Sequence, residues 1–113
     1  MLVPGQVIWA KLPFPDGSTP DYPRPFLVIS VDANRVGVLS VSSVKDKARK
    51  LLLPSNLKIE KFDPPLVMPS FVKLDSLTYH AIEAVAELPL LGNGKTLDKG
   101  EFRKILAALK RFL

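Results

Sequence analysis

The 113-residue sequence contains no cysteine and only one histidine, His80. The lack of cysteine excludes a disulfide framework, and it excludes every nucleophile or metal site built on a thiolate. A single histidine cannot supply the pair of imidazoles with which ribonuclease-type enzymes carry out acid and base catalysis. We therefore expect a structural role for His80.

The sequence also lacks a long apolar run, since none of its runs approaches the about 18 residues of a membrane-spanning helix. The opening residues, MLVPGQVIWA, have no basic segment ahead of an apolar one, so they do not read as a secretion signal. The acidic residues are scattered rather than clustered for a two-metal site, and LGNGK lacks the flanks of a P-loop. We expect a soluble, cytoplasmic protein that needs no metal and no other cofactor.

What the chain does contain is a basic surplus. Sixteen Lys and Arg against eleven Asp and Glu give a formal net charge of +5 at pH 7. Such a surplus suits a polyanion or an acidic protein partner, although it serves solubility equally well. Hydrophobic residues make up 47% of the chain, which is enough for the core of one domain spanning residues 1–113.

Short runs of β-forming residues, separated by proline and glycine, predict a fold made mainly of strands. The runs FLVISVD and VGVLSVSSV flank a tight turn, so we expect them to pair as a hairpin. Residues 71–77 alternate apolar and polar side chains, and Pro89 ends a further segment that favours a last strand. The predicted strands are 5–14, 26–32, 36–44, 57–60, 71–77 and 79–88.

The C-terminal segment predicts an amphipathic helix. Asp98 and Glu101 have the spacing of a capping box, and Thr96 is a second possible cap. Many short strands followed by one helix predict a small, partly open β-barrel with the helix packed on it. The apolar face recurs at i, i+3, i+4, i+7 and i+11, namely Phe102, Ile105, Leu106, Leu109 and Leu113.

Arg24 stands between two prolines, Pro23 and Pro25, at the end of a long loop over residues 13–25. Proline fixes its own φ and restricts the residue before it, so the backbone of Arg24 has few choices. Long ordered loops in compact domains commonly carry function. Arg24 is therefore a candidate for a guanidinium held in place for a ligand, the alternative being a surface arginine bonded to a nearby carbonyl.

Several segments, in order, resemble the PemK/MazF family, the ribosome-independent mRNA endoribonuclease toxins of type II toxin–antitoxin systems. The resemblance implies an SH3-like barrel with a C-terminal helix. It also implies that the substrate's own 2′-hydroxyl attacks the adjacent phosphate without a metal, that the protein is a homodimer, and that a cognate acidic antitoxin blocks it. The segments are PGQVIWAKL, RPFLVIS, VLSVSSV, SFVKLDSL and GKTLDKGEFRKILAALKRFL.

The resemblance also implies roles for particular residues. Arg24 would stabilise the charge that builds on the phosphate and donate a proton to the leaving 5′-oxygen. Ser42 stands where the family usually has a threonine whose hydroxyl contacts the phosphate. Ser43 is the alternative, and because neighbouring strand residues face opposite ways, we expect one of the two serines to point into the site.

Asp75 matches an acidic position of the family near the groove. It would accept a hydrogen bond from a base or orient Arg24, and a plain salt bridge is an equal alternative. The chain has Ser76 and Thr78 where the family commonly has a glutamine and an arginine.

Charged and aromatic side chains near these positions are candidates for RNA binding. Lys45 and Lys47 belong to the basic run 45–50, which would neutralise phosphates if it flanks the groove and is otherwise a solvated loop. Phe14 and Tyr22 would stack unpaired bases, although Phe14 is equally suited to the core. We expect Trp9 in the core or at a dimer surface.

Two further functions remain open from the sequence. The same barrel, catalytically weakened, would bind nucleic acid or an acidic partner without cutting. A protein target is also compatible with the fold, since the CcdB gyrase poisons share this barrel.

Overall fold

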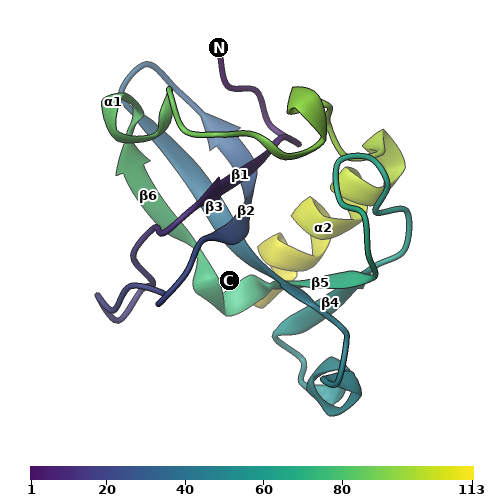
Figure 1. Cartoon of the computed structure of the whole chain (residues 1–113). Helices are drawn as coiled ribbons and strands as arrows, with labels where there is room; N and C mark the ends of the chain where they lie inside the picture. The colour runs from purple at the N-terminus through teal and green to yellow at the C-terminus, as the bar shows by residue number, and fades with distance from the viewer.

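The computed structural model describes all residues, 1–113, and contains six antiparallel strands and a C-terminal helix. The predicted mainly β fold with a terminal helix is confirmed (Figure 1). The strands are β1 (Val7–Ala10), β2 (Arg24–Val31), β3 (Arg35–Ser43), β4 (Asn56–Ile59), β5 (Ser70–Lys73) and β6 (Thr78–Ala81). The helices are α1 (Ile82–Val85) and α2 (Lys99–Phe112), with 3-10 turns η1 (Ala48–Leu52), η2 (Leu74–Ser76) and η3 (Leu91–Gly94). None of the helices is long and apolar enough to cross a membrane.

The long strand β3 organises the sheet. Its first half pairs with β2 on one side and β6 on the other, and its last three residues pair with β5. β1 extends the sheet beyond β2, and β4 extends it beyond β5. The predicted hairpin of the second and third strands is confirmed, with Asp32 accepting hydrogen bonds from the backbone N–H groups of Asn34 and Arg35 in its turn.

Alternate residues of β3 separate the core into two clusters. Leu39 and Val41 belong to the cluster under α2, whereas Val36 and Val38 belong to the cluster on the opposite side. This division follows from strand geometry, because successive side chains point to opposite faces. Figure 1 shows α2 lying along one side of the bent sheet.

The start of α2 is capped as the sequence predicted, but only in part. The Asp98 carboxylate accepts a hydrogen bond from the backbone N–H of Glu101 at 3.0 Å. The Glu101 side chain does not return to Asp98. It is 3% exposed and accepts from the backbone N–H of Glu60, just beyond β4, at 2.6 Å. The second half of the capping box thus fastens the helix to the sheet.

The buried face of α2 includes Glu101. Glu101, Ile105, Ala108 and Leu109 are the buried residues of the helix. The predicted apolar face was wrong at two positions, since Leu106 is 37% exposed and Leu113 is 78% exposed. The buried stripe is thus rotated toward Glu101 and Ala108, and Ile105, Ala108 and Leu109 pack into the core beside it.

Several predicted strands were too long. The first strand covers only Val7–Ala10 of the predicted 5–14. After Lys73 the chain turns into η2, where the Ser76 hydroxyl accepts from the backbone N–H of Ser40 and donates to the Lys73 carbonyl. The prediction of a strand over 79–88 was wrong beyond Ala81, because α1 follows β6 directly.

Candidate active site

The candidate site lies where β2 and β3 separate. Phe26 is paired with Ser40, but beyond this pair β3 turns to β5, and Ser42 is opposite Phe71. Arg24 continues β2 in the other direction and is paired with Ala10 of β1. The separation opens a cavity of about 540 Å³ that both Arg24 and Ser42 line.

This large cavity has a polar wall and an apolar wall. Arg24, Lys47 and the hydroxyls of Ser42 and Ser43 form the polar wall. A second cavity of about 220 Å³ shares Arg24, Ser42 and Lys47 with the first. The side chains that only the second cavity adds are Phe14, Ser40, Lys50, Phe71 and Lys73.

Arg24 is the first residue of β2 rather than a residue of the preceding loop, so the predicted loop over 13–25 was too long by two residues. Its Nη2 donates to the Tyr22 hydroxyl at 3.2 Å, and its Cζ lies 4.7 Å from the centre of the Tyr22 ring. The Arg24 Nε is buried and has no hydrogen-bond partner. A buried donor left unsatisfied is unfavourable, so an anionic oxygen beside this group would be stabilised.

The Ser42 hydroxyl is held by a lysine. Its Oγ accepts a hydrogen bond from Lys47 Nζ at 3.0 Å. Asp46 has a positive φ of 58°, and the backbone N–H of Lys47 donates to the Val44 carbonyl at 2.9 Å, so the chain turns back toward the strand. Because the Ser42 oxygen accepts from Lys47, its own O–H is free to donate to a ligand.

The two serines differ in their surroundings. Both line the large cavity, but only Ser42 also lines the second one. The Ser43 Oγ accepts from the backbone N–H of Lys45 at 3.1 Å, which is a local contact within the loop. Lys45 lines neither cavity, whereas Lys50 of the same basic run lines the second.

The predicted aromatic residues lie at the rims of the cavities. Tyr22 is exposed at the large cavity beside Arg24. Phe14 lines the second cavity and also packs on Phe26, with ring centres 6.4 Å apart.

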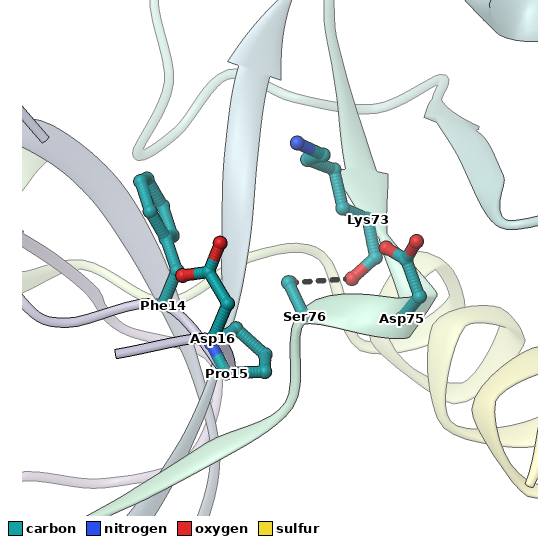
Figure 2. Close-up of a pocket in the computed structure, with 6 residues that line it drawn as sticks. All are labelled: Phe14, Pro15, Asp16, Lys73, Asp75 and Ser76. Carbon is teal, nitrogen blue, oxygen red and sulfur yellow. Dashed lines mark hydrogen bonds between the residues drawn. The ribbon is translucent and has the colours of Figure 1, made fainter. Parts of the chain in front are cut away.

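Asp75 lies in η2, and its exposed carboxylate makes no hydrogen bond or ion pair, with Arg24 or with any other residue. It lines a third cavity of about 300 Å³ together with Phe14 and Lys73 (Figure 2).

The apolar wall of the large cavity was missed from the sequence. Trp9 is 41% exposed and lies opposite Pro25 in the β1–β2 register, next to Arg24. The expectation that Trp9 lies in the core was therefore wrong, because its ring is open to the large cavity. Val67 and Met68 come from the proline-rich connection between β4 and β5, whose path no local pattern predicts.

An arginine, a lysine and a free hydroxyl converge on one cleft of this small, mainly β fold, and the chemistry of these groups suits a phosphate or a carboxylate. A family model described as PemK-like, MazF-like toxin of type II toxin–antitoxin system matches residues 3–113. The chain belongs to this toxin family, which confirms the resemblance seen in its segments. A search of curated proteins gave no match.

Proposed function

We propose that this toxin is a metal-independent endoribonuclease that cuts single-stranded RNA through attack of the substrate's own 2′-hydroxyl. The observation that carries the proposal is the convergence of Arg24 and Ser42 on one cavity, with Lys47 bonded to the Ser42 hydroxyl. Family membership supports it, because RNA cleavage is the activity for which PemK/MazF toxins are known.

In the proposed reaction, the 2′-oxygen forms a bond to the neighbouring phosphorus while the bond from phosphorus to the 5′-oxygen breaks. The 2′-hydroxyl loses a proton and the departing 5′-oxygen gains one, which gives a 2′,3′-cyclic phosphate and a 5′-hydroxyl. Negative charge builds on the non-bridging oxygens in the transition state. The Arg24 guanidinium and the Lys47 ammonium stabilise that charge, and the free O–H of Ser42 donates to one of these oxygens.

The walls of the cleft suit an unpaired strand rather than a duplex. Tyr22 and Trp9 present exposed rings at the large cavity, and aromatic faces stack on bases that are not already paired. Lys50 and Lys73 line the second cavity, where they would neutralise phosphates on either side of the reacting one.

We propose that the same cleft takes the antitoxin, because the family belongs to toxin–antitoxin systems. An extended acidic segment would place its carboxylates against Arg24 and Lys47, and its apolar side chains against Trp9, Val67 and Met68. Such a segment orders as it binds, so much of the contact free energy offsets the lost entropy. We propose, in addition, that the toxin forms a homodimer.

The test is to incubate the protein with a single-stranded RNA in the presence of EDTA and to identify the new termini. The proposal predicts fragments that end in a cyclic phosphate or 3′-phosphate and begin with a 5′-hydroxyl. RNA that binds at low salt but stays intact would instead indicate a binding module of the same fold.

A further inference from the structure

The third cavity, of about 300 Å³, lies between the loop that follows β1 and the turn that follows β5. Figure 2 shows its two walls: one wall is formed by Phe14, Pro15 and Asp16, and the other by Lys73, Asp75 and Ser76. Neither Arg24 nor Ser42 lines it, so it is separate from the cleft in which the phosphate is proposed to react.

The charged groups around this cavity are free to bind a ligand. The Asp75 carboxylate and the Lys73 ammonium make no hydrogen bond or ion pair, even with each other. Asp16 accepts the backbone N–H and the hydroxyl of Ser18 at 2.9 and 2.6 Å, both on Oδ1, which leaves Oδ2 free. These hydrogen bonds from Ser18 lower the pKa of Asp16 below its usual value, so the carboxylate stays ionised at neutral pH.

The cavity therefore offers two carboxylates that only accept hydrogen bonds and one ammonium that only donates them. Among the four RNA bases, guanine alone presents two adjacent donors, N1–H and the N2 amino group, beside an acceptor, O6. Adenine, cytosine and uracil each place an acceptor where guanine has one of these donors, and a carboxylate would repel it. The Phe14 ring adds an apolar face on which a base can stack.

We propose that this third cavity is a subsite for an unpaired guanine of the RNA. A carboxylate of Asp75 or Asp16 accepts from N1–H and the N2 amino group, and Lys73 donates to O6. This inference rests on the proposed RNA substrate, but base recognition here does not require that the RNA be cut.

The position of the subsite ties it to the reacting phosphate. The third cavity shares Phe14 and Lys73 with the second cavity, which in turn shares Arg24, Ser42 and Lys47 with the first. A strand whose phosphate lies at Arg24 can follow this row of cavities and place a neighbouring base beside Asp75. Guanine at one fixed distance from the cut would then be a determinant of specificity.

Binding is measured with short 2′-O-methyl uridine oligonucleotides, which cannot be cut through a 2′-hydroxyl. One series carries a single guanine at each position in turn, and a matched series carries inosine, which lacks the N2 amino group. For the wild-type protein we expect one position at which guanine binds about tenfold more tightly than inosine or uridine, as expected for a two-point contact with a base edge. We expect either Asp75→Asn or Asp16→Asn to remove most of this preference, according to which carboxylate makes the contact, since an amide presents a donor where the carboxylate presents an acceptor.

Asp16→Asn is the second variant, because either carboxylate can make the contact, and the double variant is expected to lose the preference altogether. Glu87→Gln is the matched control, since Glu87 is exposed and lines none of the three cavities. Equal affinity for guanine and inosine at every position in the wild type would overturn the subsite. So would a preference that survives in the double variant.

The outcomes separate this inference from the proposed function. If the wild type cuts RNA that has no guanine near the cleaved bond, the guanine subsite is contradicted and the proposed endoribonuclease activity is supported. If the protein prefers guanine in binding but cuts no RNA under any condition, the proposed endoribonuclease activity is contradicted and the guanine subsite is supported.

Discussion

Arg24 and Ser42 occupy matching positions on two neighbouring strands that have just stopped pairing. Arg24 lies two residues before Phe26, and Ser42 lies two residues after Ser40, the residue that pairs with Phe26. Because side chains alternate along a strand, the Arg24 side chain points to the same face of the sheet as Phe26, and the Ser42 side chain points to the same face as Ser40. Both therefore point to the same side of the sheet, where the two strands part and the cavity opens.

Arg24→Ala is expected to reduce RNA cleavage by roughly a hundred- to a thousand-fold, the effect of removing one charged contact made to the transition state. Arg24→Lys should restore only part of the rate, because an ammonium lacks the planar fork of the guanidinium. The rates are measured in single-turnover reactions with EDTA. Equal rates for the wild type and Arg24→Ala would contradict the assignment, and circular dichroism serves as the control for folding.

Ser42→Ala should reduce cleavage more than Ser43→Ala does. Ser42 lines both cavities, and its hydroxyl accepts a hydrogen bond from the Lys47 ammonium. The Ser43 hydroxyl instead accepts a hydrogen bond from the backbone N–H of Lys45. Ser42→Thr keeps the hydroxyl and stiffens its rotamer, so it is expected to match or exceed the wild-type rate. If Ser43→Ala reduces cleavage more than Ser42→Ala, the active hydroxyl is that of Ser43.

Lys47→Ala should lower the cleavage rate and also weaken the salt dependence of RNA binding, because one phosphate contact is lost. Lys58→Ala is the matched control, since Lys58 is an exposed residue of β4 and lines none of the three cavities. Binding is measured over a range of salt concentrations, and cleavage is measured beside it. If the two variants behave alike, the contact between Lys47 and Ser42 has no role in function.

Glu101→Ala should destabilise the fold by about 1–3 kcal/mol, because the backbone N–H of Glu60 loses its acceptor in a partly buried place. Glu101→Gln keeps an acceptor oxygen and is expected to have a smaller effect. Urea denaturation gives the free energy of unfolding of each variant. An equal loss in both variants would show that the charge of Glu101, rather than the hydrogen bond to Glu60, stabilises this end of α2.

His80 is expected to make stability depend on pH. Its ring lies 2.9 Å from the Thr78 hydroxyl, and burial lowers the pKa of His80 below its usual value. The unfolded chain therefore takes up the proton at a higher pH than the folded chain does. The free energy of unfolding should be fully maintained above about pH 6.5 and should fall as the pH drops through that value.

The measurement is urea denaturation on both sides of the ordinary imidazole pKa, for the wild type and His80→Gln. The variant should show a flatter dependence on pH in this range, because glutamine does not titrate. Parallel curves for the two proteins would mean that other groups cause the change.

Local signals in the sequence predicted much of the fold. The cap at Asp98, the terminal helix and the hairpin of β2 and β3 depend on neighbouring residues, and all are present. The strand predicted over 79–88 failed after Ala81, since short apolar segments of this composition form helix or strand according to their surroundings. The buried face of α2 was predicted less well, because it includes Glu101, whose partner Glu60 lies 41 residues away and cannot be read from a periodic pattern, whereas Leu106 and Leu113 are exposed.

The candidate site was predictable in its polar half only. A guanidinium between prolines and a hydroxyl at a strand end are visible as residue types, and the structure brings Arg24 and Ser42 to one cavity. The apolar wall could not be predicted from the sequence, because Val67 and Met68 belong to the connection between β4 and β5, which is distant in sequence from Arg24 and Ser42. Lys73 was missed for a similar reason, since its place beside Asp75 and Asp16 depends on how the loop after β1 folds over β5.

In the proposed reaction the RNA's own 2′-hydroxyl is the nucleophile, and Arg24 and Ser42 act on the adjacent phosphate. The most direct measurement compares the rate at the preferred cleavage site in a single-stranded RNA with the rate in the same RNA carrying one 2′-deoxy nucleotide immediately 5′ of the cut bond, both in EDTA. We expect the all-RNA substrate to yield a cyclic phosphate end and the singly substituted substrate to stay uncut at that bond. Cleavage of both substrates at the same bond and at similar rates would contradict the proposed reaction.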